Sequence, residues 1–180
     1  APPPDYITRS GGIFRDMTIH DFDMARWLLG QEVDSVFASA SVLVDPRIGE
    51  LGDFDSANVI LRTASGRQAI ITNTRRAAYG YDQRIEVLGA TGMVSAENHG
   101  ENRITLADKD GFHSAPLLNF FMSRYTAAYA NEINAFVTAV NSKTEAPTTG
   151  HDGLMALALA EAALKSVATG RLVKVSEVLG

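Results

Sequence analysis

Asp16, His20 and Asp23 have the spacing of residues that share one face of a helix. At about 100° per residue they fall within roughly 60° of arc, whereas Asp21 points well away from them. A carboxylate one turn from an imidazole can fix its tautomer and raise its basicity, as a general base for a hydroxyl proton requires. The spacing therefore favours acid/base chemistry on this face.

The same spacing allows two other interpretations. Acidic residues near a helix N-terminus interact favourably with the helix dipole, so the face could simply be solvated. Asp16 and His20 also resemble half of a helical pair of metal ligands, but no second histidine lies nearby and the chain has no cysteine. Spacing alone leaves the choice open, and we expect no metal.

Composition excludes several classes of partner. The net charge is −5 and the longest basic run is Arg75-Arg76, so the basic surface that nucleic acid requires is missing. The longest apolar run, near residues 154–164, is interrupted by Glu161 and is shorter than a membrane span. We expect a cytoplasmic protein that binds neither nucleic acid nor membrane. The start at Ala1-Pro2-Pro3 is interpreted as the interior of a longer chain.

The elements that must position these residues follow from periodicity and turn residues. Residues 13–29 have helical periodicity, and Gly30 suits a left-handed cap. Further helices are expected over 125–140, where Tyr125, Tyr129 and Phe136 should be core, and over 152–168. Strands are expected over 6–8, 33–44, 57–62, 68–74, 85–89, 93–97, 103–107, 112–116 and 172–175.

Strands in one block between helices predict an α+β domain with a large, mostly antiparallel sheet and helices packed on one face. Apolar residues such as Val33, Val36, Val42, Ile60 and Ile71 indicate that the second face is also apolar. Contact with another copy of the chain would bury that face, which predicts a homo-oligomer. Loops or a further domain could cover it equally well.

One long string supports a family resemblance. Residues 11–28 read GGIFRDMTIHDFDMARWL, with Gly-Gly, then Asp16, three residues, His20, two residues and Asp23. This string resembles the signature of the Gfo/Idh/MocA oxidoreductases, and within them the inositol 2-dehydrogenases. The resemblance extends through the segment Tyr81–Gly89 to the closing residues Gly170–Val173.

The resemblance implies roles for individual residues. His20 matches the acid/base that takes a hydroxyl proton as hydride passes to nicotinamide, and Asp16 matches its supporting aspartate. Asp23 matches a residue placed to bind substrate hydroxyls, and Tyr79, ahead of Tyr81, matches a tyrosine that reaches the polyol. On the residues alone, either tyrosine could be a half-buried aromatic on a sheet.

The resemblance also implies a wider organisation. Residues 1–180 would form the substrate-binding and oligomerisation domain, assembling as a dimer or tetramer, and NAD would bind mainly to an N-terminal Rossmann domain absent from this chain. The family's Gly-rich nucleotide turn and Glu-Lys-Pro segment do not occur here, and Gly89-Ala90-Thr91-Gly92 is predicted to be a hairpin turn. This chain alone should therefore be inactive. Another sugar oxidoreductase of the family, or a non-catalytic member that serves association, fits the same residues.

Overall fold

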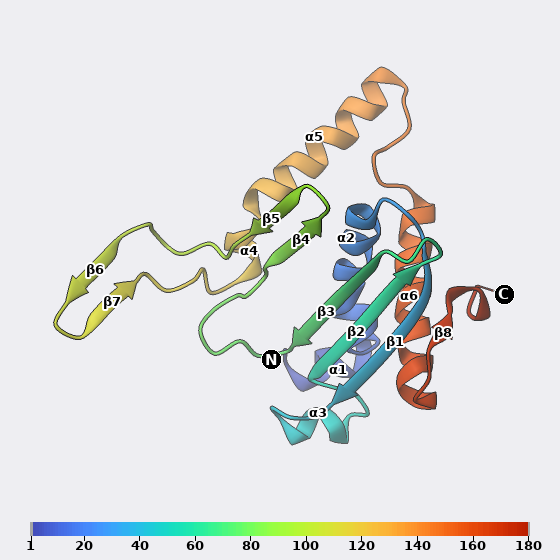
Figure 1. The fold of residues 1–180 in the computed structure, drawn as a ribbon, viewed down its shortest axis with the longest axis horizontal. Helices are drawn as coiled ribbons and strands as arrows, with labels where there is room; N and C mark the ends of the chain where they lie inside the picture. Colours follow the sequence, from blue (N-terminus) through green and yellow to red (C-terminus); the bar gives the residue numbers. More distant parts are fainter. Residues whose placement is uncertain (1, 180) are drawn as a thin grey trace. The chain divides into compact units, whose positions relative to one another are not determined.

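The computed structural model describes residues 2–179 and divides into two compact units. The first unit comprises Ala1–Arg76 with Thr148–Gly180, and the second comprises Ala77–Pro147. The two segments of the first unit are distant in sequence, as their different colours in Figure 1 show. They share one hydrophobic core.

A four-stranded antiparallel sheet in the order β3-β2-β1-β8 forms the centre of the first unit. Helices α2 and α6 pack on one face of it (Figure 1). In chain order the elements are α1 (Pro4–Ser10), the π-helix η1 (Phe14–Thr18), α2 (Ile19–Leu29), β1 (Val33–Ser41), α3 (Pro46–Glu50), β2 (Ser56–Thr63), β3 (Gln68–Thr74), α6 (Gly150–Thr169), β8 (Val173–Lys174) and the short 3-10 helix η2 (Val175–Glu177).

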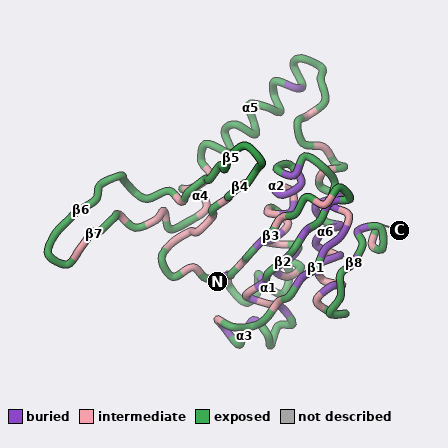
Figure 2. Tube along the Cα trace, viewed as in Figure 1, coloured by how far each residue is buried: buried purple, intermediate pink, exposed green. Residues whose placement is uncertain are grey.

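Alternation along the strands explains which face is covered. In β2 the side chains of Ala57, Val59 and Leu61 are buried, while the residues between them are exposed. Helix α6 presents a row of buried alanines, whose small side chains let the helix lie close to β1. The resulting core is drawn in purple in Figure 2.

The second unit buries much less of its own surface. It contains two separate hairpins, β4 (Ile85–Gly89) with β5 (Gly92–Ala96) and β6 (Thr105–Asp108) with β7 (Gly111–Ser114), followed by α4 (Phe121–Arg124) and α5 (Thr126–Ser142). Ala139 is the one buried residue among those described in this unit, and Figure 2 shows the rest mostly exposed.

The α+β class with an antiparallel sheet is confirmed, but three details of the prediction are wrong. Residues 6–8 lie in α1, because Pro4 at the first helical position favours a helix start as readily as an extended entry. The strands form three separate sheets, with α3 inserted between β1 and β2. Tyr129 and Phe136, expected in the core, are 44% and 58% exposed.

The uncovered face of the four-stranded sheet carries an apolar row. Phe37 pairs with Ile60, and Ile60 pairs with Ile70, so three large side chains lie across three adjacent strands. Their exposed fractions are 38%, 43% and 75%. The predicted apolar second face is therefore present.

Ser166 joins α6 to β1 and to the chain just before β8 begins. Its Oγ accepts a hydrogen bond from the backbone N–H of Ala38 at 2.9 Å and donates one to the carbonyl of Arg171 at 2.6 Å. The residue is fully buried.

We predict that Ser166→Ala lowers the free energy of unfolding by about 1–3 kcal/mol, because it leaves a buried backbone N–H without its partner. Urea unfolding of this variant beside Ser39→Ala, an exposed change in the same sheet, measures the effect. Equal stability of the two variants would contradict the role given to Ser166.

Candidate functional site

Two glycines set the entry to the helix that carries His20. Gly11 and Gly12 have φ values of 89° and 87°, the left-handed region that favours glycine. A Cβ on Gly12 would lie 3.0 Å from Oδ1 of Asp53, so the close approach also requires glycine. The chain then enters the wide turns of η1 before it continues as α2.

Asp16 lies in η1 and is held by two side chains from outside its helix. The Tyr6 hydroxyl, from α1, donates to Oδ1 of Asp16 at 2.5 Å, and Nη1 of Arg75 donates to Oδ2 at 3.3 Å. The hydrogen bond to Asp16, aided by its negative charge, raises the pKa of Tyr6. The carboxylate is thus fixed in direction by contacts that the sequence did not reveal.

Arg75 is a buried residue, although it belongs to the longest basic run of the chain, Arg75-Arg76. Its side chain is 2% exposed, and Nη2 donates to Oδ2 of Asp53 at 2.8 Å. Its Nε donates to the carbonyl of Phe54 at 3.2 Å. The guanidinium points inward because two carboxylates compensate its charge there, whereas Arg76 is exposed.

His20 lies in the first turn of α2 and is exposed. Within residues 2–179, no hydrogen bond joins its ring to the Asp16 carboxylate. The structure thus places the two residues in one continuous helical segment, with Asp16 anchored to the protein and the imidazole open to a ligand. Their roles toward a substrate remain predictions.

Asp21 is half-buried and contacts β3. Its Oδ2 accepts a hydrogen bond from Nδ2 of Asn73 at 2.9 Å. Burial raises the pKa of Asp21, and this outweighs the opposite effects of the Asn73 hydrogen bond and the His20 charge. The Oδ1 atom of Asn73 is buried without a partner in the described structure.

Asp23 is paired within its own helix. Its Oδ1 accepts from Nη1 of Arg26 at 3.2 Å, and its side chain is 49% exposed. Arg26 is itself buried and also contacts Glu32 and Asp152. A half-exposed carboxylate with one oxygen engaged can still accept hydrogen bonds from hydroxyls.

Tyr79 belongs to the second unit and is 60% exposed. Its hydroxyl donates to Oδ2 of Asp82, and this hydrogen bond raises the pKa of Tyr79. Arg84 lowers the pKa of Asp82 to about 2, with smaller contributions from Tyr79 and Asn98. Tyr81 is half-buried and makes an edge-on contact with Tyr125, so Tyr79 is the more exposed of the two tyrosines.

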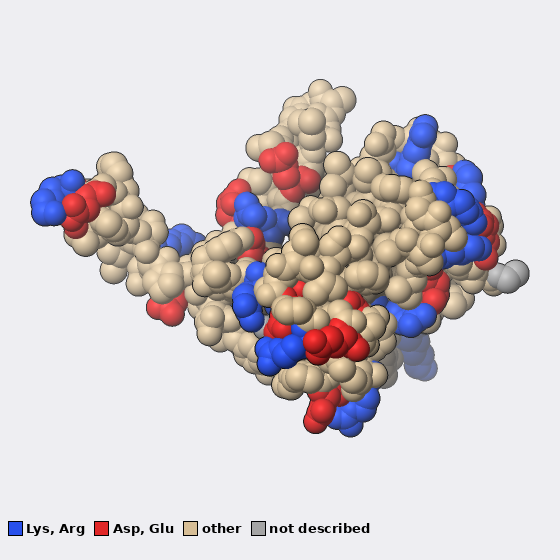
Figure 3. Space-filling view, turned by 90° about the horizontal axis from the view of Figure 1, so that it is seen from below, with Lys and Arg blue, Asp and Glu red and all other residues tan. Residues whose placement is uncertain are grey.

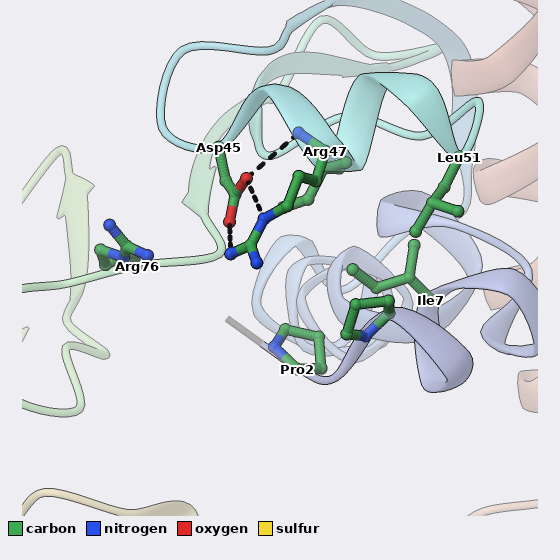
Figure 4. Close-up of a pocket in the computed structure, with 8 residues that line it drawn as sticks. Pro2, Ile7, Asp45, Arg47, Leu51 and Arg76 are labelled. Atoms are coloured by element: carbon green, nitrogen blue, oxygen red, sulfur yellow. Dashed lines mark hydrogen bonds and ion pairs between the residues drawn. The ribbon is translucent and has the colours of Figure 1, made fainter.

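The turn at residues 89–92 does not resemble a phosphate cradle, and the hollow in the first unit lies away from the predicted site. Residues 89–92 connect β4 to β5 as the predicted hairpin turn. A hollow of about 210 Å³ in the first unit is lined by Asp45, Arg47 and Arg76 among others, but by none of the predicted site residues. Figure 4 shows Arg47 already paired with Asp45 there.

The residues that the structure describes lack two further features. No group of three metal-binding side chains is found among them. None of their helices has the length and hydropathy to cross a membrane.

Sequence reasoning missed Tyr6, Asp53, Asn73 and Arg75 as neighbours of the His20 helix. One signal was available: Asn73 and Arg75 are two residues apart at the end of a predicted strand, so they share a face. No sequence signal connected Asp53 or Tyr6 to this site.

We predict that Asp21→Asn raises the free energy of unfolding at pH 7 by about 1 kcal/mol, since the new amide can donate to the unpartnered Oδ1 of Asn73. A raised folded-state pKa means that Asp21 stabilises the fold when protonated, and that this contribution is lost as pH rises through the folded pKa. The gain should therefore shrink below about pH 4. Urea unfolding at pH 7 and below about pH 4, with the exposed Asp110→Asn as control, measures the gain. A loss of stability of Asp21→Asn at pH 7 would contradict the prediction.

The comparisons with known proteins agree on one family. The model of the GFO/IDH/MocA C-terminal domain matches residues 1–95. The chain is 61% identical over 176 residues to the inositol 2-dehydrogenase of Rhizobium meliloti (strain 1021), covering 98% of this chain and 53% of that relative. It is 52% identical over 181 residues to the myo-inositol 2-dehydrogenase of Thermotoga maritima, covering 100% and 54%.

Solved structures give the same result. The myo-inositol dehydrogenase from Corynebacterium glutamicum ATCC 13032 superposes with a TM-score of 0.93 at 40% identity, covering 96% of this chain and 52% of that one. The scyllo-inositol dehydrogenase from Lactobacillus casei with bound NAD(H) and scyllo-inositol gives 0.86 at 29%, covering 96% and 51%. The chain spans about half the length of the curated relatives it matches. With the signature helix and this fold, it belongs to the Gfo/Idh/MocA family and contains that family's C-terminal domain.

Proposed function

We propose that residues 1–180 form the substrate-binding and oligomerisation domain of an NAD-dependent inositol 2-dehydrogenase. The reaction is oxidation of a secondary hydroxyl of a cyclic polyol, myo-inositol to scyllo-inosose. The observation that carries the proposal is the exposed His20 imidazole on a helix whose Asp16 is anchored to the protein. The names of the relatives at 61% and 52% identity support the choice of polyol.

In this proposal His20 removes the proton from the reacting hydroxyl. Its exposure allows a substrate oxygen to approach the ring, and the negative charge of Asp16, one helical turn away, stabilises the imidazolium that forms. Asp23 and Tyr79 are assigned to the remaining hydroxyls of the polyol. The half-exposed carboxylate accepts hydrogen bonds, and the phenol can accept as well as donate.

The dinucleotide is assigned to a Rossmann domain outside these residues. The turn at residues 89–92 connects the two strands of a hairpin and therefore does not fit a bound pyrophosphate. When bound, NAD would supply the nicotinamide ring that accepts the hydride. The choice of NAD is supported by the cofactor in the Lactobacillus casei structure and by a Bacillus subtilis relative named scyllo-inositol 2-dehydrogenase (NAD(+)). The cytoplasm, where NAD is recycled, is the proposed location.

We predict that His20→Ala, in the full-length protein that contains this chain, lowers kcat for myo-inositol by about 10²- to 10⁴-fold and leaves the KM for NAD nearly unchanged. The rate of NADH formation over a panel of myo-inositol, scyllo-inositol and glucose measures this. His113→Ala, an exposed histidine of β7, is the matched control.

Equal loss of NAD binding and turnover in His20→Ala would contradict the role of His20. Preference for glucose would indicate another sugar oxidoreductase of the family. Absence of turnover with every substrate would indicate a non-catalytic member that serves association.

The proposal includes a homo-oligomer formed through the open face of the four-stranded sheet. The row of Phe37, Ile60 and Ile70 supports it, since a large apolar patch on a sheet favours association. A nucleic-acid partner is not proposed. The basic and acidic side chains on the face shown in Figure 3 are interspersed, in keeping with the net charge of −5.

We predict that Ile70→Lys shifts the full-length protein to a smaller oligomer or monomer, because a charge within an apolar contact is costly to bury. Light scattering coupled to size-exclusion chromatography gives the mass. Ile133→Lys, at another exposed isoleucine, in α5, should keep the wild-type mass. Unchanged mass of the Ile70 variant would exclude this face as the contact.

A further inference from the structure

The last residues of β3 and the residue that follows them contact the His20 helix at two points. Asn73 and Arg75 are two positions apart, which places both side chains on the same side of the extended chain. Asn73 donates to Asp21 at 2.9 Å, and Arg75 donates to Asp16 at 3.3 Å. Both side chains therefore reach the same helical segment.

These two contacts lie on either side of His20 in the sequence. Asp16 is one turn before the histidine, and Asp21 is the residue directly after it. We infer that Asn73 and Arg75, here called the β3 clamp, are positioning residues that fix where the His20 imidazole stands. The inference rests on the proposed role of His20 and adds residues outside the signature helix to the machinery of the site.

The clamp has the rigidity that positioning requires. The Arg75 side chain is 2% exposed, and it also binds Asp53 at 2.8 Å and the carbonyl of Phe54 at 3.2 Å. Asp53 uses its other oxygen to accept from the backbone N–H of Ile13 at 2.9 Å. The guanidinium cannot swing away without leaving the negative charges of two largely buried carboxylates uncompensated, which is strongly disfavoured.

The two members contact the helical segment before and after His20 along the sequence. Arg75, through Asp53, fixes the point where the chain enters η1, and Asn73 fixes the first turn of α2. A helix pinned on one side alone could rotate or tilt. Pinning on both sides of His20 fixes the position of its ring relative to the sheet, and small displacements of a reacting group reduce rates steeply.

Kinetics of the full-length enzyme test the clamp. Asn73→Ala and Arg75→Lys should each lower kcat by about 10- to 100-fold and leave the KM for NAD unchanged. The lysine keeps the positive charge but cannot reach both carboxylates as the planar guanidinium does. Asn141→Ala and Arg103→Lys, at exposed positions, are the matched controls.

The His20→Ala background separates positioning from general structural damage. There the clamp substitutions should cause no further loss of residual rate, because the group that they position is gone. Equal losses in both backgrounds, or no loss in the wild-type background, would overturn the inference.

A second measurement does not depend on turnover. In protein with ¹⁵N-labelled histidine, the ring signals of His20, assigned by their loss in His20→Ala, should shift in Asn73→Ala and Arg75→Lys and stay in place in the controls. Unshifted signals would overturn the clamp. If the signals shift but the wild-type enzyme oxidises no polyol, the proposed function fails and the clamp stands as a structural device.

Discussion

The buried guanidinium of Arg75 is the contact on which the arrangement of the first unit depends. It joins the chain after β3 to the carboxylate after α3 and to the carboxylate of η1. Three segments distant in sequence meet at one charge. A buried charge persists only when its partners are in place, so this cluster forms only when the sheet, α3 and the helical segment have all reached their native positions.

The two units differ in how they are stabilised. The first unit has a continuous core between α2, α6 and the sheet, closed by Ser166 and by the buried alanines of α6. The second unit consists of two hairpins and two helices that bury almost none of their own apolar surface. Small two-stranded hairpins are marginally stable alone, so neighbouring structure must supply the burial that this unit lacks.

Much of the fold was predictable from local pattern, while the site's supporting contacts were not. The bounds of β3 and of β4 follow from alternation and turn residues, and the helix ending at Gly30 follows from periodicity and its cap. The helical start at Pro4 was missed because prolines favour both extended chain and a first helical turn. The burial of Arg75 depends on Asp53, 22 residues away, and no local pattern encodes that distance.

The division of the strands into three sheets was missed for a similar reason. Alternation identifies a strand, but it does not say which strands pair with each other. A hairpin turn brings only its own two strands together, and pairing with further strands depends on where the hairpin packs. The face of the His20 helix was predicted from ideal α geometry. The wide turns of η1 alter that geometry between Asp16 and His20.

The π-helical turns of η1 also limit how the length of the chain can vary. A π turn holds one residue more than an α turn, so removal of any single residue from Phe14–Thr18 would let the segment relax into a regular helix. Loss of Met17 or Thr18 would leave Asp16 and His20 three residues apart instead of four. Loss of Phe14 or Arg15 would shorten the stretch between Asp16 and Ile13, whose backbone N–H donates to Asp53. Either change alters how the carboxylate and the imidazole are placed against the contacts that hold this segment. The residue count of this stretch is therefore constrained more tightly than the identity of its exposed side chains.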